Sequence, residues 1–318
     1  MSLDTESILD RRRVRRQLSF WRVLAVVALT FAVGAFFLSG DRGLIDRRQI
    51  ARVSIEGMIT ENRDFLNLLD RIGKDKRVAG VIVYVNSPGG TTTGGESIYE
   101  ALRRLAEKKP VVAQFGTVAA SAAYIAGLGT DYIVARGNSI TGSVGVIMQW
   151  PEVSGLLDKL GIRVNEVKSG PLKANPSPFQ PLDESGRAIA EEMIAESHRW
   201  FLDLVSTRRQ VTTSTIPGLE QGRVFSGREA LEYKLIDQIG GEPEAIRWLE
   251  SQGVEKDLKV VNWKESSGVE WPLGGAVAGV VRYLTGAIGG DLAGLVSAER
   301  LGILGLDGLV SVWQPSEN

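Results

Sequence analysis

The chain has 318 residues, of which 43% are hydrophobic and 24% are charged, and its net charge is -1 at pH 7. A chain of this length and apolar content buries one large core or two smaller ones, which excludes a disordered protein. The near-neutral charge gives no electrostatic basis for binding nucleic acid. The absence of cysteine excludes a disulfide framework, a thiolate metal site and a cysteine nucleophile.

The N-terminal region predicts a single membrane anchor. Six arginines lie between positions 11 and 22, and residues 23–40 carry no charge. Eighteen helical residues rise roughly 27 Å, close to the thickness of a bilayer core. We expect a basic cytoplasmic N-terminus over 1–22, an anchor over 23–40 and a linker over 41–49, with the domain that follows on the extracytoplasmic side of the cell (inner) membrane. A cleaved signal peptide is the alternative.

Hydrophobic periodicity divides the following residues into alternating strands and helices. The apolar run Val78–Val85 is typical of a strand buried on both faces, as in parallel sheets. The alternation predicts an α/β domain with right-handed crossovers, which we place at 50–264. The tail at 265–318 is glycine-rich and apolar. The predicted strands are 50–58, 78–85, 110–115, 131–135 and 258–263, and the predicted helices are 64–72, 96–108, 121–128, 183–208, 227–233 and 242–250.

Ser121 is the candidate nucleophile. It lies among small residues in Ala119–Tyr124, where a helix is predicted to begin. Small neighbours leave room for a substrate backbone, and backbone amides at a helix start can stabilise an oxyanion. The alternative is that Ser121 is a helix N-cap with no chemical role.

A second segment, Asn86–Gly90, follows the buried strand at its carboxyl end, where α/β sheets place their sites. Paired glycines allow a backbone amide to turn into a cleft. The amide of Gly89 or Gly90, with that of Ala122, would therefore form a two-donor oxyanion hole. An ordinary strand-to-helix turn also explains Pro-Gly-Gly, but it does not explain the pairing with Ser121.

Lys173 is the candidate general base. A lysine accepts a proton near neutral pH only when desolvation lowers its pKa from about 10.4. The apolar neighbours Pro171, Leu172 and Phe179 are compatible with partial burial. A solvated surface lysine is the alternative, and Lys168 is the nearest rival for the role.

The single histidine, His198, lies inside the predicted helix 183–208, on what we take as its polar side. A Ser-His-Asp triad also needs a positioned acid, so this chemistry is disfavoured. No His/Asp/Glu cluster in the sequence has metal-ligand spacing, and neither a Walker loop nor a Gly-x-Gly-x-x-Gly motif follows a strand. We predict no metal and no cofactor.

Five separated motifs occur in an order and spacing typical of a known family. They are Asn86–Gly90, Ala120–Tyr124, Thr141–Ile147, Lys168–Lys173 and Gly222–Gly227. This pattern, from about residue 50 to residue 241, resembles the signal peptide peptidase A family in its short, single-domain form. The resemblance implies a Clp-protease/crotonase-like α/β fold of stacked ββα units. It also implies a membrane-anchored serine endopeptidase that degrades remnant signal peptides and other hydrophobic peptides.

The resemblance further assigns roles and partners. It implies that Ser121 is the nucleophile, Lys173 the general base and Ser143 the hydroxyl that orients the lysine ammonium. The short form of the family assembles into a dome-shaped ring, in which the serine and the lysine can come from neighbouring protomers. We therefore expect a homo-oligomeric ring with shared active sites, hydrophobic peptides as substrates and no nucleic acid partner.

Two other functions stay open on the sequence. One is a stomatin-partner type of peptidase, which uses the same Ser-Lys chemistry on a specific membrane protein. The other is a catalytically silent, crotonase-like scaffold that only binds peptides. A crotonase acting on coenzyme A thioesters is disfavoured, because a membrane anchor and a serine/lysine pair serve no purpose there.

Overall fold

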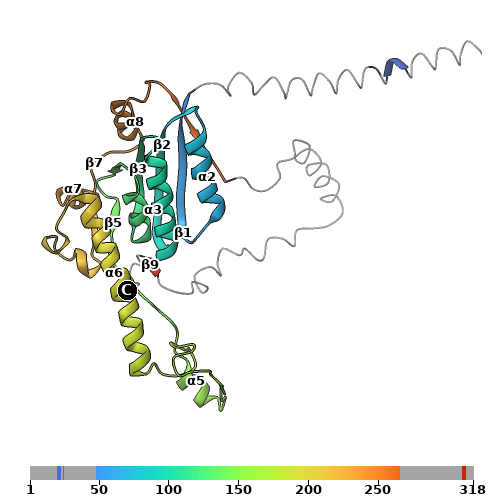
Figure 1. Ribbon diagram of the computed structural model, residues 1–318, viewed down its shortest axis with the longest axis vertical. Coiled ribbons are helices and arrows are strands. Elements are labelled where there is room, and N and C mark those ends of the chain that lie inside the picture. Colours follow the sequence, from blue (N-terminus) through green and yellow to red (C-terminus); the bar gives the residue numbers. More distant parts are fainter. Residues whose placement is uncertain (1–19, 23, 25–47, 266–309, 313–318) are drawn as a thin grey trace, which may run out of the picture. The chain divides into compact units, whose positions relative to one another are not determined.

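The computed structural model describes residues 20–22, 24, 48–265 and 310–312 (Figure 1). The predicted anchor at 23–40 lies outside these residues apart from one position, and so does most of the tail at 265–318. Among the residues described, no helix is long and apolar enough to cross a membrane. The chain divides into two compact units, residues 1–48 and 49–318.

A mostly parallel sheet of nine strands forms the centre of the second unit. Its order is β6-β5-β3-β2-β1-β8, while β4 pairs with β3 and β7, and β9 pairs with β2. Among these strands only the β5–β6 and β2–β9 pairs are antiparallel. The strands are β1 (Gln49–Ile59), β2 (Val78–Thr91), β3 (Val111–Ala120), β4 (Tyr132–Ala135), β5 (Ile140–Gly142), β6 (Val224–Ser226), β7 (Gln238–Ile239), β8 (Lys259–Asn262) and β9 (Val310–Val312).

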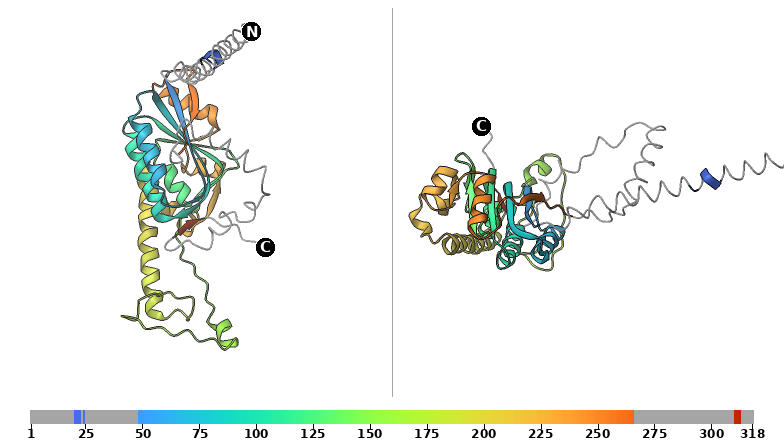
Figure 2. Two further views of the ribbon diagram at one scale, coloured as in Figure 1. Left: turned by 90° about the vertical axis from the view of Figure 1, so that its right-hand side faces the viewer. Right: turned by 90° about the horizontal axis from the view of Figure 1, so that it is seen from above.

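Helices cover both faces of the sheet (Figure 2). Buried side chains of α2, α3, α4 and α6 join the main core on one face, and those of α8 form a smaller core on the other. Two 3-10 turns, at Thr213–Thr215 and Leu219–Gln221, precede β6. The helices are α2 (Arg63–Lys74), α3 (Thr92–Ala106), α4 (Ala122–Leu128), α5 (Ser154–Lys159), α6 (Glu184–Arg209), α7 (Gly227–Glu232) and α8 (Glu242–Ser251).

Alternate side chains of β2 enter the two cores. Val81, Val83 and Val85 belong to the main core under the helices, whereas Ile82 packs with Leu249 of α8 on the opposite face. All of these side chains are buried. The continuous apolar run is therefore required by burial on both faces, and the predicted parallel α/β architecture is confirmed.

One boundary differs from the sequence prediction in a way that affects the site. Asn86–Gly90 was predicted to follow the strand, with an ordinary strand-to-helix turn as the alternative, but it lies inside β2, which continues to Thr91. Gly90 pairs with Ile59 of β1, and a Cβ atom on Gly90 would lie 1.9 Å from the Ile59 carbonyl oxygen. The glycine thus permits a close approach of two strands, which local turn chemistry does not predict.

Residues 147–182, here called the projecting segment, lie between β5 and α6 and bury almost no side chains. The short helix α5 has no buried residue, and Ser177 is the one buried side chain of the segment. Figure 1 shows α5 beyond the sheet, near the first turns of α6. A surface with many exposed apolar side chains is typical of an interaction site. The exposed large apolar side chains of the projecting segment are Ile147, Leu156, Leu160, Ile162, Val164, Val167, Leu172 and Phe179.

Candidate active site

Ser121 lies in a sharp turn between β3 and α4. Its backbone has φ 59° and ψ -121°, a conformation that residues other than glycine rarely adopt. Its N–H donates to the Gly142 carbonyl at 2.9 Å, and its own carbonyl accepts from the Ile125 N–H at 3.0 Å. A serine on a strained strand-to-helix turn, held by such bonds, is a backbone arrangement typical of hydrolase nucleophiles.

The Ser121 side chain does not cap α4. It occupies the N-cap position without a capping hydrogen bond, whereas the side chains of Thr91 and Asp183 cap α3 and α6. Ser121 is only 1% exposed. The N-cap alternative therefore does not explain this serine or its unusual backbone.

The helix behind Ser121 is rigidly packed. Every residue of α4 is buried, and a Cβ atom on Gly95 of α3 would lie 3.2 Å from the Cβ of Ala122. The Tyr124 hydroxyl donates to the Leu235 carbonyl at 2.8 Å, and burial raises the pKa of the Tyr124 phenol. The small residues around Ser121 thus allow two helices to meet directly behind the turn.

The structure brings the predicted oxyanion glycines to the same end of the sheet. Ser87 of β2 pairs with Ala119 of β3, two residues before Ser121. Gly89 follows with φ 115°, and its N–H donates to the Ser87 Oγ at 3.1 Å. Because the Ser87 hydroxyl already accepts the Gly89 N–H, Gly90 is the better of the two candidate donors.

Ser143 also lies next to the Ser121 turn. β5 pairs with β3 so that Gly142 is opposite Ala120, and the Gly142 carbonyl accepts the Ser121 N–H. Ser143 has φ 52°, is 8% exposed, and donates its N–H to the Arg223 carbonyl at 2.9 Å. The structure therefore places two of the predicted serines on adjoining backbone segments.

A cavity of about 340 Å³ lies beside Ser143, and His198 of α6 helps to line it. His198 is half-buried rather than solvated, and its Nε2 is buried without a hydrogen-bond partner in the part of the chain described. No hydrogen bond joins His198 to Ser121 or to an acid within that part, so the structure assembles no triad. Among the same residues, no group of three or more histidine and carboxylate side chains could hold a metal ion.

Lys173 does not join this cluster within one chain. It is exposed in the projecting segment, in the connection between α5 and α6. Within the described residues its ammonium has neither a hydrogen bond nor an ion pair, while its rival Lys168 pairs with Glu166 at 2.6 Å. The structure thus separates the predicted base from the predicted nucleophile.

The turn that carries Lys173 is nevertheless a folded feature. The Lys173 N–H donates to the Gly170 carbonyl at 3.1 Å. The Asn175 side-chain amide donates to Asp183 at 3.1 Å, and the same Asp183 oxygen caps α6 by accepting from the Gly186 N–H. Lys173 is therefore presented at a defined position relative to α6.

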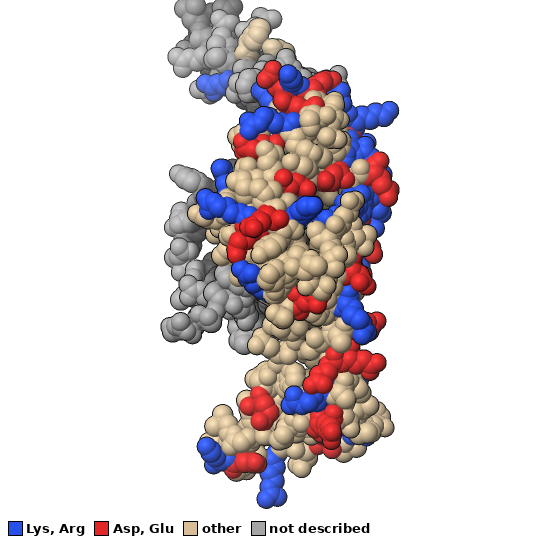
Figure 3. Space-filling view, turned by 90° about the vertical axis from the view of Figure 1, so that its left-hand side faces the viewer, with Lys and Arg blue, Asp and Glu red and all other residues tan. Residues whose placement is uncertain are grey.

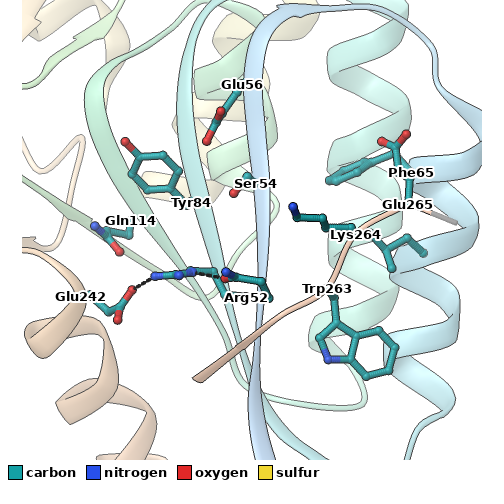
Figure 4. A pocket seen from close by; sticks show the side chains of 12 residues that line it. Arg52, Ser54, Glu56, Phe65, Tyr84, Gln114, Glu242, Trp263, Lys264 and Glu265 are labelled. Atoms are coloured by element: carbon teal, nitrogen blue, oxygen red, sulfur yellow. Dashed lines mark hydrogen bonds and ion pairs between the residues drawn. The ribbon is translucent and has the colours of Figure 1, made fainter. Parts of the chain in front are cut away.

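A second cavity, of about 690 Å³, lies on the sheet face beyond α8 (Figure 4). Arg52, Tyr84 and Gln114 line it from β1, β2 and β3, each two residues after a side chain that packs under α8. Arg52 pairs with Glu242, which neutralises its charge. None of the predicted catalytic residues lines this cavity, so it is a separate polar recess.

The exposed charges are mixed in sign. On the face that Figure 3 shows, Lys and Arg side chains are interspersed with Asp and Glu. An electrostatic surface for nucleic acid would require a broad basic area. This face offers none.

Comparison with known proteins places the chain in a family. Residues 103–256 match peptidase family S49, and residues 49–136 match Clp protease. The chain is 33% identical over 214 residues to a protein of Synechocystis named as a protease, covering 66% of this chain and 77% of that one. The chain belongs to peptidase family S49, the signal peptide peptidase A family.

Two further relatives of this S49 protein bear similar names. A protein of Methanocaldococcus jannaschii named as a protease is 38% identical over 189 residues, which is 59% of this chain and 61% of the relative. A protein of Enterococcus faecium named as signal peptide peptidase SppA is 31% identical over 228 residues, which is 67% of this chain and 66% of the relative. The chain thus spans less than two thirds of either relative.

One strand beside the Ser121 turn was not predicted from the sequence. β9 lies along β2 with Val312 opposite Gly89, Ser311 opposite Gly90 and Val310 opposite Thr91, and it also lies beside α4. A strand of three residues in a glycine-rich tail has no detectable hydrophobic period. Its pairing is decided by the edge that β2 presents, so no local signal marks it.

Proposed function

We propose that this protein is a membrane-anchored serine endopeptidase that cleaves remnant signal peptides and other hydrophobic peptides in an extended conformation. The observation that carries the proposal is the strained Ser121 turn, which lies beside a β2 edge that pairs with an extended segment. Membership of peptidase family S49 supports the same chemistry.

A peptide substrate adds to the sheet in the proposed mechanism. Its backbone pairs with the β2 edge at Gly89–Thr91, since main-chain hydrogen bonds to a strand edge bind extended peptides irrespective of side chain. This pairing brings a scissile carbonyl to the Ser121 hydroxyl. The N–H groups of Gly90 and Ala122 stabilise the oxyanion that develops on that carbonyl.

Lys173 completes the reaction. The neutral amine accepts the Ser121 hydroxyl proton as the oxygen attacks, and it returns that proton to the departing amine. Ser143 holds the lysine nitrogen in position from its place beside the Ser121 turn. An arginine cannot substitute, because a guanidinium does not lose its proton in this pH range.

The lysine comes from a neighbouring copy in this proposal. Ser121 is buried in the body of one chain, whereas Lys173 is exposed on a projecting segment rich in exposed apolar side chains. Packing that segment against a second protomer would bury the apolar side chains and desolvate the lysine at once. Repetition of this contact around a closed ring would give every protomer one complete site.

Residues 23–40 hold the protein in the membrane in this proposal, with the catalytic domain on the extracytoplasmic side. The arginines before this charge-free run favour a cytoplasmic N-terminus. A protease anchored in this way is close to hydrophobic peptides left in the bilayer.

The proposal is tested by mixing two inactive variants. Ser121→Ala and Lys173→Ala should each abolish cleavage of a fluorogenic hydrophobic peptide, and Lys168→Ala, the matched control, should stay active. Co-assembly of the two inactive variants in equal amounts should restore about a quarter of the sites, because random neighbours combine an intact serine with an intact lysine that often.

Two results would contradict the proposal. An inactive mixture of variants that do co-assemble, as measured by native mass spectrometry, rules out sharing of the site. Failure of a fluorophosphonate probe to label Ser121 in the assembled wild type rules out the nucleophile, and the silent peptide-binding scaffold then becomes the better function.

A further inference from the structure

The turn that carries Lys173 has an unusual backbone. Ala174 follows Lys173 with φ 59°, a conformation that residues other than glycine rarely adopt. Such residues persist only where the surrounding structure holds them, and they cluster at functional sites. Ser121 and Ser143 also have positive φ. The other residues of this kind in the described part of the chain are Gln210, Lys234 and Asp257. Three of these six residues therefore lie at, or next to, the predicted site residues.

The side chain of Asn175 fixes this turn on the first turn of α6. Its amide donates to Asp183 Oδ1 at 3.1 Å, and the same oxygen accepts the Gly186 N–H at 2.6 Å. A Cβ atom on Gly186 would lie 2.3 Å from the Asn175 Nδ2 and 2.5 Å from its Oδ1. We call Asn175, Asp183 and Gly186 the Asn175 seat. Glycine is unfavourable within a helix, and here the close contact with Asn175 requires it.

The seat lies at the end of α6 that is remote from the main core. Phe201, in the second half of α6, belongs to that core, and Gly186 precedes it by 15 positions. Fifteen helical residues rise about 22 Å. The far end of α6 is bonded to α4 through Arg208, whose guanidinium donates to the Leu128 carbonyl at 2.9 Å. The helix therefore holds the seat, and Lys173 with it, away from the core of its own chain.

We propose that Asn175 is a positioning residue, which fixes the direction in which Lys173 extends toward Ser121 of a neighbouring copy. This inference rests on the proposed function, because it assumes that Lys173 is the base and that a neighbour uses it. Asn175 touches neither the substrate nor the serine and acts through the backbone of Lys173. A base works only within hydrogen-bond reach, and a misplacement of about 1 Å costs on the order of 10²-fold in rate.

A pair of substitutions tests the seat. Asn175→Ala removes the side chain, and Gly186→Ala places a methyl group where that side chain lies. Each should lower kcat for a fluorogenic hydrophobic peptide by about 10–10²-fold with KM unchanged. The double variant should be no slower than either single variant, because both changes break the same contact. Ser185→Ala, an exposed neighbour in α6, is the matched control and should keep the wild-type kcat. Additive losses in the double variant overturn the proposal.

Mixed assemblies separate positioning from a general loss of structure. In a mixture of Ser121→Ala and Lys173→Ala chains, only the Ser121→Ala chain supplies a lysine. Asn175→Ala added to that chain should lower the restored activity by about 10–10²-fold. The same change added to the Lys173→Ala chain should leave the restored activity unchanged. A defect in folding or assembly would lower both, so equal losses overturn the proposal.

Failure of the inference and failure of the proposed function give different results. An inactive mixture without any change at Asn175 contradicts the shared site, whereas the comparison of single and double variants still decides whether Asn175 and Gly186 act together on the rate. An active mixture, together with a wild-type kcat in Asn175→Ala, contradicts the positioning role alone.

Discussion

Ser121 lies in a turn whose neighbours Ala120 and Ala122 are fully buried, whereas Lys173 lies in a turn whose neighbours Leu172 and Ala174 are exposed. The first turn is held by a sheet and by a helix with no exposed residue. Among the described residues, the second is held by the bond from Asn175 to Asp183 at the start of α6, on a segment with almost no core. A single chain therefore suffices to hold Ser121, the proposed nucleophile, in place, while the desolvation that Lys173 would need in order to act as a base must come from a further contact.

The largest expected effect on activity is at Lys173, the proposed base. Lys173→Arg keeps the positive charge and most of the side-chain length but removes a proton acceptor. We expect kcat for a fluorogenic peptide to fall by about 10²–10⁴-fold, the range for loss of a general base. Lys168→Arg, in the same segment, is the control and should retain activity. Equal activity of the two variants would show that Lys173 does not act as the base.

Glycine substitutions probe the packing of the two regions. Gly90→Ala places a Cβ atom 1.9 Å from the Ile59 carbonyl oxygen, so β1 and β2 must move apart. We expect a loss of about 1–3 kcal/mol in the free energy of unfolding, measured by urea denaturation, together with lost activity.

Gly170→Ala is the matched control in the Lys173 turn, where no atom of the described residues, apart from the two chain neighbours, lies within 4 Å of the added Cβ. Its free energy of unfolding should change by less than about 0.5 kcal/mol. Similar losses at both positions would mean that the two regions are packed alike.

The helix behind Ser121 offers a smaller test of rigidity. Tyr124→Phe leaves the buried Leu235 carbonyl without the hydroxyl that donates to it, which costs about 1–3 kcal/mol of unfolding free energy. Tyr84→Phe is the control, because its hydroxyl lines the open recess and has no hydrogen-bond partner among the described residues. Thermal unfolding followed by circular dichroism should separate the two variants, and coincident curves would contradict the role of the Tyr124 bond.

The smallest effect on one chain is expected in the projecting segment. Leu160 is largely exposed, so Leu160→Glu should change the free energy of unfolding by less than about 0.5 kcal/mol. If the segment packs against a neighbour, the same change disrupts assembly, which sedimentation velocity would detect. Asp158→Glu, two residues away, should leave assembly intact. An unchanged sedimentation profile for Leu160→Glu would remove this face from the proposed interface.

Much of the fold follows from local pattern. The run Val78–Val85 and the periodicity of α2 and α6 predict a parallel α/β domain, and the structure confirms it. The short elements β5, α5 and β9 were not predicted, because three to six residues do not complete a hydrophobic period. Gly90 was placed beyond the end of the strand for a related reason, since only its contact with Ile59 explains a glycine inside a strand.

The features of the candidate site also divide into those that the sequence predicts and those that only the structure shows. The residue types around Ser121, Gly89 and Gly90 were informative by themselves, because small side chains and paired glycines limit what the backbone can do there. The sequence determined by itself that this chain forms a parallel α/β domain with a candidate serine nucleophile, since side-chain volume and periodicity act over a few residues. Only the tertiary structure decided the positive φ of Ser121, the exposure of Lys173 and the pairing of β9 with β2. Each of these depends on contacts between residues far apart in the chain, such as the bond from the Ser121 N–H to Gly142, and no local pattern encodes them.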